Sequence, residues 1–461
     1  MFEKFYALAP VFIQNIMISA YGYKWKSRRF GGVFKEQVQA FKSREFYSKD
    51  QWHNYQETEL RKLLLHCLKT VPYYQEVFKN IGLTENEIKI FKVEDLKKIP
   101  PLTKEDFRKF GTTTLMSITY NKKGTFLSTS GSSGTPSKIY FSEEFHQIWQ
   151  ASIEARVRNW AGLDYSVPRG MIGGRKIITN PNASPPYYRY NYFENQTYFS
   201  AYHISPENVQ GYVDGMFKNN VEWMNGYTVS NYLLAKFINE LGIKTPRLKA
   251  VITSSEKLLP SMRIEMEKAY GCKIFDSYSG NEACGLISET PNAQLLFSPD
   301  TGIMEVVDDG LNPVENGIEG EGIFTGLINY DQPLIRYRIG DSIKMAANQT
   351  SNCKREMPVV EEITGRVEDK VKTKDGKVMV RFHSLYYEIE GIRRAQIVQE
   401  SLTSFVFNIE IDSGYNKVQA EQLIADRLKV QIRYIDSIQF NYLDSIPNEK
   451  SGKFKSVISK I

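Results

Sequence analysis

The spacing of hydrophobic and polar residues changes along the chain and divides it into segments. Residues 35–110 combine recurring apolar positions with many charges, which predicts helices separated by turns at Gly82 and at Pro100–Pro101. Residues 143–160 show the same period and predict a further helix. Residues 165–200 are dense in Tyr, Pro and Asn without a clear period, so we expect irregular structure there.

The middle of the chain predicts alternating strands and helices. Ser205 and Pro206 resemble an N-cap and first helical residue, which predicts a helix reaching about residue 219. Short apolar runs at 248–253 and 272–278 flank a helical pattern at 258–270. A strand–helix–strand unit of this kind implies a parallel sheet and an α/β architecture.

Beyond Gly365 the pattern changes to short alternating elements. A hairpin at 370–380 turning at Asp375–Gly376, a helix near Tyr386, strands at 404–411 and 437–443, and a helix at 417–428 are predicted. The expected fold is therefore α/β. A large N-terminal domain, 1–364, has parallel-containing sheets packed by helices, and a small α+β C-terminal domain spans 365–461.

The amino-acid composition indicates the general type of protein. The 461 residues are 41% hydrophobic and 24% charged, which is ordinary for a globular chain. A net charge of +6 is mild at this length, and no nucleic-acid signature accompanies it. The 4 cysteines form no CxxC pair and no metal-type spacing with histidine, so a reduced, cytoplasmic protein without nucleic-acid partners is expected.

The first residues form a separate apolar segment. Residues 5–23 are mostly apolar and are followed by Lys24, Lys26, Arg28 and Arg29, without the features of a cleaved signal peptide. We expect a helix docked on the protein. The alternative is peripheral attachment at the inner face of a membrane.

A loop rich in Ser, Thr and Gly is the most informative segment. It reads Ser-Thr-Ser-Gly-Ser-Ser-Gly-Thr-Pro-Ser-Lys from Ser128 to Lys138 and does not match the Walker A pattern. Its glycines free backbone N–H groups, its hydroxyls donate hydrogen bonds, and Lys138 supplies positive charge, as a polyphosphate requires. The alternative to a phosphate-binding loop is a flexible linker without a binding role.

The run TSGSSGTPSK resembles the phosphate loop of the adenylate-forming superfamily, which includes acyl-CoA synthetases, nonribosomal-peptide adenylation domains and luciferases. Tyr278-Ser-Gly-Asn-Glu282 resembles the Tyr-Gly-x-Thr-Glu signature of that superfamily, with Asn281 departing from the usual Thr or Ser. The resemblance implies that Glu282 holds the Mg²⁺ of MgATP and that Tyr278 lies against the adenine.

Further motifs follow in the superfamily's order. Tyr337-Arg-Ile-Gly-Asp341 is similar to Tyr-x-Thr-Gly-Asp, Gly365-Arg-Val-Glu-Asp369 to Gly-Arg-x-x-Asp, and Pro447-Asn-Glu-Lys-Ser-Gly-Lys453 to the C-terminal lysine signature. The resemblance implies that Asp341 and Arg366 contact the ribose and that Lys453 stabilises the adenylation transition state. Each motif alone could be an ordinary turn, surface charge or solubilising tail. Their occurrence in the superfamily's order is hard to obtain by chance, and the resemblance covers essentially the whole chain.

These motifs and the residues beside them give a candidate site. The residues implied to bind ATP are Thr129, Ser130, Gly131, Ser132, Ser133, Gly134, Thr135, Lys138, Ser255, Glu256, Tyr278, Asn281, Asp341 and Arg366. Lys453, Glu282 and His203 are the catalytic candidates, Glu282 is the metal ligand, and Glu368 or Asp369 is the hinge between the two domains. His203 has three open interpretations, as part of the acyl pocket, as a base in the second step or as a structural residue.

Shorter stretches carry a finer likeness, namely Gly173-Gly174-Arg175, Pro185–Tyr188, Tyr198–His203, Asn225-Gly226-Tyr227 and Thr253-Ser254-Ser255-Glu256. Within the superfamily they most resemble the phenylacetate–CoA ligase-like branch, and inside it CapK-type polysaccharide biosynthesis proteins. The expected reaction is ATP-dependent activation of a carboxylic acid as an acyl-adenylate, with release of pyrophosphate and transfer of the acyl group. The acceptor stays open between CoA, an amine and a sugar hydroxyl. The alternatives are a catalytically degenerate nucleotide-binding protein and a glycosyltransferase-associated factor of a polysaccharide pathway.

Overall fold

The structure is a computed structural model that forms two compact units. It describes residues 6–128, 137–175, 177–178, 184–366, 371–374, 378–379, 383–386, 389, 391–411, 414–432, 434–447 and 454–461. Unit 1 comprises 1–339 and 344–362, and unit 2 comprises 340–343 and 363–461. The division after Glu362 lies beside the predicted boundary at residue 365, while the roles predicted for the two parts stay predictions.

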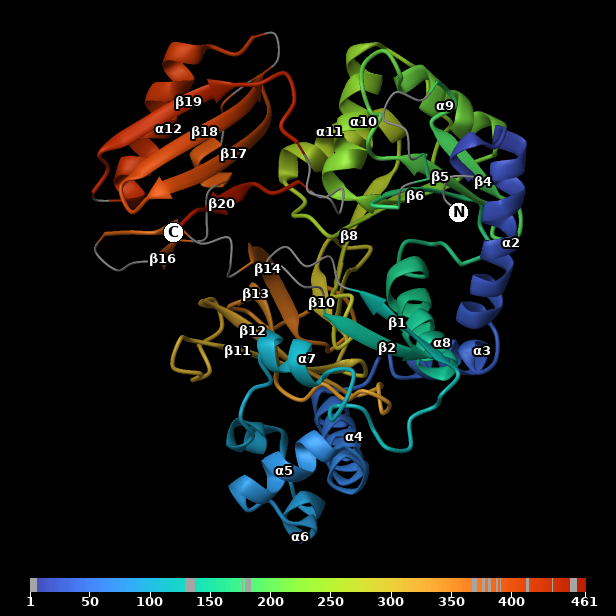
Figure 1. Ribbon diagram of the computed structural model, residues 1–461, viewed down its shortest axis with the longest axis vertical. Helices are drawn as coiled ribbons and strands as arrows, with labels where there is room; N and C mark the ends of the chain where they lie inside the picture. Colours follow the sequence, from blue (N-terminus) through green and yellow to red (C-terminus); the bar gives the residue numbers. More distant parts are fainter. Residues whose placement is uncertain are drawn as a thin grey trace. The chain divides into compact units, whose positions relative to one another are not determined.

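Helices make up the first part of unit 1 (Figure 1). They are α2 (Val11–Phe30), α3 (Phe34–Ser43), α4 (Lys49–Thr70), α5 (Pro72–Ile81), α6 (Glu85–Lys89), the 3₁₀ helix η1 (Val93–Lys98) and α7 (Lys104–Phe110). Their ends follow from the sequence, since Thr103 caps α7 through the Asp106 amide and Gly82 ends α5 at φ 71°. The helices predicted over 35–110 are thus confirmed.

A hairpin and a helix follow. Strands β1 (Gly124–Ser128) and β2 (Lys138–Ser142) pair antiparallel, and α8 (Glu143–Ile153) continues into the π-helix η2 (Glu154–Arg158). The helix predicted for residues 143–160 is therefore present.

The central feature of unit 1 is a sheet whose strands lie in the order β11-β12-β13-β14-β10-β9-β8-β7-β6-β3-β5-β4. Their bounds are β3 (Arg169–Gly173), β4 (Tyr188–Asn191), β5 (Gln196–Ser200), β6 (Trp223–Tyr227), β7 (Ala250–Ser254), β8 (Lys273–Ser279), β9 (Leu286–Glu289), β10 (Leu295–Phe297), β11 (Gly302–Val307), β12 (Glu319–Gly326), β13 (Tyr337–Met345) and β14 (Val359–Arg366). Strands β5, β3, β6, β7 and β8 pair in parallel, which confirms the predicted α/β class.

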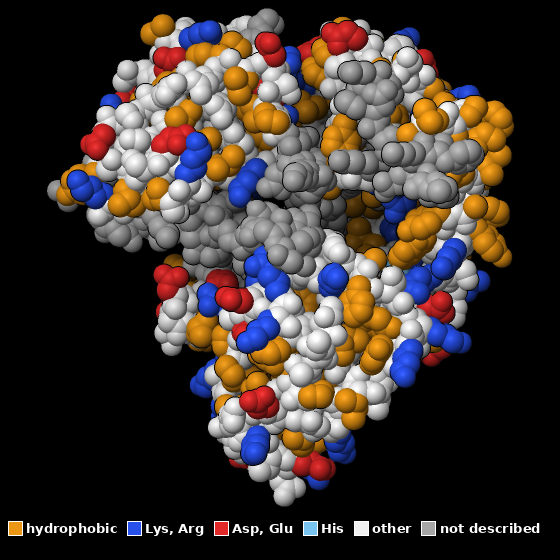
Figure 2. Space-filling view, in the orientation of Figure 1, with side chains coloured by type: hydrophobic (Ala, Val, Ile, Leu, Met, Phe, Trp, Pro, Cys, Tyr) orange, Lys and Arg blue, Asp and Glu red, His pale blue; other side chains and the backbone are white. Residues whose placement is uncertain are grey.

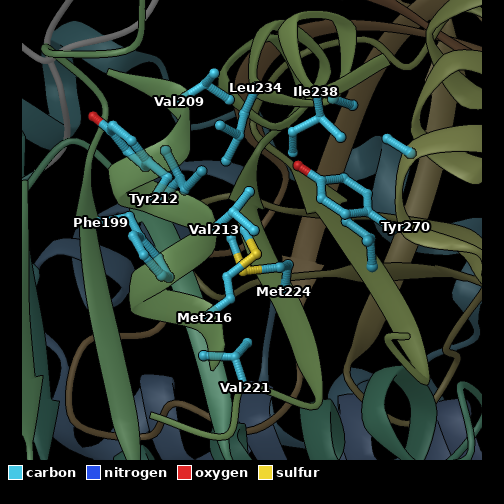
Figure 3. Close-up of a cluster of buried hydrophobic side chains, with 14 of the residues drawn as sticks. Phe199, Val209, Tyr212, Val213, Met216, Val221, Met224, Leu234, Ile238 and Tyr270 are labelled. Atoms are coloured by element: carbon cyan, nitrogen blue, oxygen red, sulfur yellow. The ribbon is translucent and has the colours of Figure 1, made fainter. Parts of the chain in front are cut away.

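Helices α9 (Val209–Lys218), α10 (Thr228–Glu240) and α11 (Pro260–Tyr270) pack on one face of these parallel strands. Side chains of α9 and α10 meet those of β5 and β6 in a closely packed apolar cluster (Figure 3). Phe199, Met224 and Leu234 are all at or below 1% exposed there. This burial holds the parallel strands in place and so fixes where their ends lie.

Two expectations for the middle of the chain are wrong. Residues 165–200, which we expected to be irregular, contain the strands β3, β4 and β5. These strands are only four or five residues long and carry Gly, Tyr and Asn in place of an apolar run. Tertiary pairing supplies the stability that local propensity lacks there. The helix expected from Ser205 begins at Val209, because Ser205 closes a turn in which its carbonyl accepts from the Asn208 and Val209 amides.

Unit 2 is an α+β unit built on a small sheet of order β19-β18-β17-β20. Its elements are β15 (Val371–Lys372), β16 (Val378–Met379), the 3₁₀ helix η3 (His383–Tyr386), β17 (Ile392–Ser401), β18 (Ser404–Ile411), α12 (Lys417–Gln431), β19 (Ser437–Tyr442) and β20 (Val457–Ser459). Strands β15 and β16 pair as the predicted hairpin, although its turn at Asp375–Gly376 lies outside the described residues. Strands β17 and β20 were not anticipated, and Phe405, Phe407 and Ile424 form the apolar core between sheet and helix.

Candidate functional site

The parallel strands bring several predicted residues to one edge of the sheet. The register pairs Gly173 with Ser200, and Tyr227 with Ser254. Because β5, β3, β6, β7 and β8 run in the same direction, the segments that follow them emerge at the same edge. Those segments are 201–203, 174–175, the end of β6 at Tyr227, 255–256 and 280–282. The carboxyl ends of parallel strands are where α/β folds bind ligands.

Glu282 is held by a buried tyrosine. The Tyr337 hydroxyl donates a hydrogen bond of 3.3 Å to Glu282 Oε1, and Tyr337 is only 1% exposed. Burial, and then the neighbouring Glu282 carboxylate, raise the pKa of Tyr337 well above its usual range, so the phenol stays a donor. A Cβ added at Gly280 would lie 2.7 Å from Glu282 Oε2 and 2.7 Å from Ile339 Cδ1, so alanine at this position would require both side-chain ends to shift.

The residues around Glu282 differ in exposure. Tyr278 is half-buried near the end of β8, with its ring centroid 6.3 Å from that of Phe324, whereas Asn281 is exposed. A carboxylate oxygen is a preferred ligand of Mg²⁺, so the chemistry of Glu282 fits the predicted metal role. The structure places Tyr278, Asn281 and Glu282 together, and their individual roles stay predictions.

The segment after β7 has an unusual backbone. Ser255 adopts φ 72°, a left-handed conformation that is costly for a non-glycine residue. It is held by Glu256, whose Oε2 accepts from the Val229 amide at 2.8 Å and whose carbonyl accepts from the Thr228 hydroxyl at 2.8 Å. The Glu256 carboxylate therefore sits at the N-terminus of α10, where negative charge is favoured, and positions the exposed Ser255.

Tyr227 joins this group from β6. Burial raises the pKa of Tyr227 to about 12, with further contributions from Glu256 and Tyr202. Tyr202 donates a hydrogen bond of 3.4 Å to the Gly174 carbonyl. The ends of β3, β5, β6 and β7 are thus linked by side chains at the same edge.

His203 is buried at this edge and is held by contacts on several sides. Its Nδ1 is 2.7 Å from the Ser200 hydroxyl, and its ring stacks on Tyr187 at 4.9 Å between centroids. Asn208 donates to the His203 carbonyl at 3.0 Å, and the residue is 8% exposed. These contacts fix the imidazole, which suits a structural or pocket-lining role, and all three interpretations of His203 stay open.

Arg175 lies beside the same strand ends and is exposed. Its Nη1 donates to the Tyr198 hydroxyl at 3.0 Å, and its guanidinium lies 4.9 Å above the Tyr198 ring centroid. An exposed guanidinium fixed by an aromatic ring can pair with an anion.

The predicted phosphate loop connects β1 to β2. Its ends are set by the pairing of Ser128 with Lys138, and Lys138 is exposed at the start of β2. Gln332 anchors the hairpin, since its Nε2 donates to the Lys138 and Gly111 carbonyls and its Oε1 accepts from the Tyr140 amide. The loop residues Thr129, Ser130, Gly131, Ser132, Ser133, Gly134 and Thr135 lie outside the described residues.

The remaining predicted residues fall in or near unit 2. Asp341 is in β13, and Arg366 is the last residue of β14. Glu368, Asp369 and Lys453 lie outside the described residues. Their assignments therefore stay predictions.

Two further histidines, His66 in α4 and His146 in α8, lie away from this edge. Burial lowers the pKa of His146, in α8, to about 3, so its ring is neutral. His66 Nε2 lies 2.8 Å from the Tyr330 carbonyl.

Sequence reasoning missed the supporting residues. Tyr337 stands in a quoted motif, but its bond to Glu282 depends on the spacing of β8 and β13 in the sheet. Tyr227 and Gln332 act through contacts with residues far away in the chain, and no local pattern predicts such contacts. Only the Asn225-Gly226-Tyr227 run, noted for its family likeness, pointed toward this strand end.

The amino-acid sequence is similar to one described domain family and to several known proteins. Residues 371–460 match the family described as CapK C-terminal domain. The chain is 24% identical to Protein CapK of Staphylococcus aureus over 469 aligned residues, covering 100% of both chains. It is 23% identical to phenylacetate-coenzyme A ligase of Escherichia coli (strain K12), covering 77% of this chain and 82% of that protein.

The fold has a close structural counterpart. The crystal structure of 2-hydroxyisobutyryl-CoA ligase in the postadenylation state, in complex with 2-HIB-AMP, superposes with a TM-score of 0.70 at 18% identity. The match covers 90% of this chain and 91% of that one. The predicted resemblance is therefore confirmed: the chain has the fold of adenylate-forming ligases, is similar to phenylacetate-coenzyme A ligases over most of its length, and is similar to a CapK protein along its whole length.

Proposed function

We propose that the protein activates a carboxylic acid with ATP, forming an acyl-adenylate and pyrophosphate, and then transfers the acyl group to an acceptor. The observation that carries this proposal is the carboxylate of Glu282, fixed by Tyr337 at the carboxyl-end edge of a sheet with the fold of adenylate-forming ligases. The chain is similar to Protein CapK along its whole length, and we propose a role in polysaccharide biosynthesis from the resemblance of its sequence to CapK-type proteins.

Attack of a carboxylate on the α-phosphate builds negative charge, so catalysis depends on preorganised positive charge and donors. Mg²⁺, when bound, neutralises part of that charge, and Glu282 is the residue that would hold it. Lys138 would neutralise the phosphates from the start of β2. Ser255, in its left-handed conformation, would turn its hydroxyl and amide toward the nucleotide. Tyr337 keeps the Glu282 carboxylate oriented.

The acid would lie against the segments that follow β3 and β5. Arg175, exposed and stacked on Tyr198, is suited to hold an anionic group, and His203 with Tyr202 would line the pocket. The acceptor is undecided between CoA, as the relation to phenylacetate-coenzyme A ligases favours, and an amine or sugar hydroxyl, as a polysaccharide role favours.

The reaction is tested by its products. Purified chain with MgATP and a panel of carboxylic and amino acids should release pyrophosphate and AMP, and repeating the panel with CoA, amino sugars or neither identifies the acceptor. Formation of ADP and orthophosphate would indicate a different ligase class. No turnover with any acid, together with tight ATP binding, would favour the degenerate nucleotide-binding alternative.

We further propose that residues 365–461 form a mobile domain that carries the catalytic Lys453. Lys453→Ala should abolish adenylation yet leave acyl transfer from supplied acyl-adenylate largely intact, because the charge that Lys453 meets exists only during the first step. Single-turnover assays of both steps separate the two effects. Equal loss in both steps, or in neither, would contradict the assignment.

The hinge is tested by limited proteolysis. If the hinge lies at Glu368 or Asp369, cleavage should begin near these residues and its rate should change with ATP or an acyl-adenylate analogue. Cleavage elsewhere first, insensitive to either ligand, would contradict a mobile C-terminal domain.

A further inference from the structure

Helix α2 is oriented with its polar side toward the protein. It packs against β4, the edge strand of the large sheet, and its Asn15 Oδ1 accepts from the Tyr190 amide at 3.0 Å. Ser19 Oγ accepts from the Tyr192 amide, also at 3.0 Å. An edge strand presents unpaired N–H groups, and here polar side chains of α2 satisfy one of them in β4 and another in the turn that follows it.

Further inward contacts include polar and small residues, beside Ile18 and Phe30, which are partly buried against apolar clusters. Gln14 is 6% exposed, and its Oε1 accepts from the buried Arg189 guanidinium. Gly22 is buried against Asn191, and a Cβ at Gly22 would lie 2.1 Å from Asn191 Nδ2. A surface helix of a globular protein normally turns its apolar stripe inward, and α2 departs from that rule because it buries several polar residues while large apolar side chains stay exposed.

The outward side of α2 is consequently apolar. Phe12 is 63% exposed, Ile16 is 56% exposed and Tyr23 is 62% exposed, at positions that recur on one side of the helix. The ring of Tyr23 lies 5.0 Å from that of Phe193, which is itself exposed. The exposed side chains that form this surface, here named the α2 ridge, are Leu8, Phe12, Ile16, Tyr23, Tyr192 and Phe193. Figure 2 shows hydrophobic side chains gathered along the right-hand margin, where α2 lies.

The charge at the α2 ridge has one sign. Residues 6–30 contain no Asp or Glu. The neighbouring acids are paired with arginines of the helix, Glu143 with Arg28 at 3.8 Å and the buried Glu194 with Arg29. Lys24 is exposed one residue beyond Tyr23, so the ridge ends in positive charge.

We propose that the α2 ridge is a docking surface for an anionic lipid bilayer, with α2 lying in the plane of the interface. Apolar side chains of such a helix enter the acyl boundary, aromatic rings lie at the headgroup level, and lysines meet anionic lipid. Within the described part of the chain no helix is long and apolar enough to cross a bilayer, so the contact is superficial. A second copy of the chain is the competing occupant, but the ridge offers no acidic side chain to Lys24 of that copy.

The test is sedimentation of the full chain with vesicles of phosphatidylcholine, with or without an equal part of phosphatidylglycerol. The chain should pellet with the anionic vesicles and do so less at high salt. Phe12→Ser with Ile16→Ser should weaken the partition coefficient by about tenfold for each side chain removed. Lys24→Glu should weaken binding to anionic vesicles by about tenfold and leave binding to phosphatidylcholine unchanged.

Matched controls lie elsewhere in unit 1. Ile90 and Ile264 are 74% and 65% exposed, so Ile90→Ser with Ile264→Ser removes similar exposed apolar area and should leave vesicle binding unchanged. Lys268→Glu, exposed on α11, is the control for charge. All replaced side chains are exposed, so the thermal midpoints should stay close to that of the original chain.

Two outcomes overturn the proposal. One is that the original chain does not pellet with anionic vesicles, or pellets equally well after Phe12→Ser with Ile16→Ser. The other is that light scattering shows a dimer that this double variant converts to a monomer while vesicle binding is absent, which would make the ridge an interface between two copies.

Discussion

The helix-covered face of the parallel strands and the carboxyl-end edge of the same strands are held by different forces. On the face, Ile172, Val251 and Ile274 are at most 2% exposed and pack against three helices. At the edge, Ser255 is strained and exposed, and Glu282 depends on a 3.3 Å hydrogen bond from Tyr337. Apolar burial stabilises the strands, and a small number of polar contacts position the side chains of the proposed site. Substitutions should therefore separate stability from activity.

The largest expected change in stability is on the helix-covered face. Leu234 in α10 is 0% exposed, so Leu234→Ala should lower the free energy of unfolding by about 2–5 kcal/mol through lost burial and a residual cavity. Denaturant unfolding measures this. Leu241→Ala, at a position 53% exposed, is the control and should change it by less than about 0.5 kcal/mol. If the variant at Leu234 instead lost activity while keeping its stability, the comparison would fail.

The largest expected change in activity is at the edge. Glu282→Gln should reduce adenylation by about 100-fold to 1,000-fold, or about 2.7–4 kcal/mol of transition-state stabilisation, with little change in melting temperature. Glu240→Gln, at the exposed end of α10, controls for loss of a carboxylate. Normal turnover with normal dependence on Mg²⁺ would show that Glu282 is not the metal ligand.

One acid on the helix-covered face, Asp276, makes stability depend on pH. Burial, and then the Glu289 carboxylate, raise the pKa of Asp276 from 3.8 to about 7, although Arg263 opposes this. The folded state then binds a proton that the unfolded state has lost, so the free energy of unfolding should fall as pH rises from about 4 to about 7. The decrease is on the order of a few kcal/mol.

Asp276→Asn should remove this decrease, because the amide keeps the acceptor that the Ser277 amide and the Thr253 hydroxyl use. Unfolding in denaturant at several pH values measures it. Asp214→Asn, at an exposed position in α9, should leave the slope unchanged. A slope in the Asp276→Asn variant equal to that of the original chain would contradict the buried-acid account.

The smallest expected change in activity follows from adding a methyl group at Gly280, beside Glu282. Gly280→Ala places a Cβ 2.7 Å from Glu282 Oε2 and from Ile339 Cδ1, so the carboxylate must shift and adenylation should fall by about tenfold. Gly211→Ala, in α9 where a Cβ meets no atom within 4 Å, should be neutral for activity and stabilise by about 0.5–1 kcal/mol. Equal activity in the two variants would mean that the position of Glu282 is not critical.

The same two regions show how far the sequence can be interpreted. The strand–helix–strand unit of β7, α11 and β8 was predictable, because apolar runs and a C-terminal Gly271 at φ 63° mark it locally. Strands β3, β4 and β5 were not, because each is stabilised by its neighbours in the sheet, and β4 also by α2, more than by its own composition.

The candidate site divides in a similar way. Glu282, Tyr278 and Ser255 stand in or beside motifs that the family likeness makes visible in the sequence. The hydrogen bond of Tyr337 to Glu282 and the cap that Glu256 forms on α10 arise only when distant segments meet. The orientation of α2 also depends on the edge of β4, so the apolar segment alone could not distinguish its inward from its outward side.

The central claim, adenylation at the carboxyl-end edge, is tested most directly by exchange of labelled pyrophosphate into ATP across a panel of acids. The account predicts acid-dependent exchange by the original chain, and a loss of about 100-fold or more in Glu282→Gln but not in Glu240→Gln. Exchange that is equal in all three proteins, or formation of ADP and orthophosphate in its place, would contradict it.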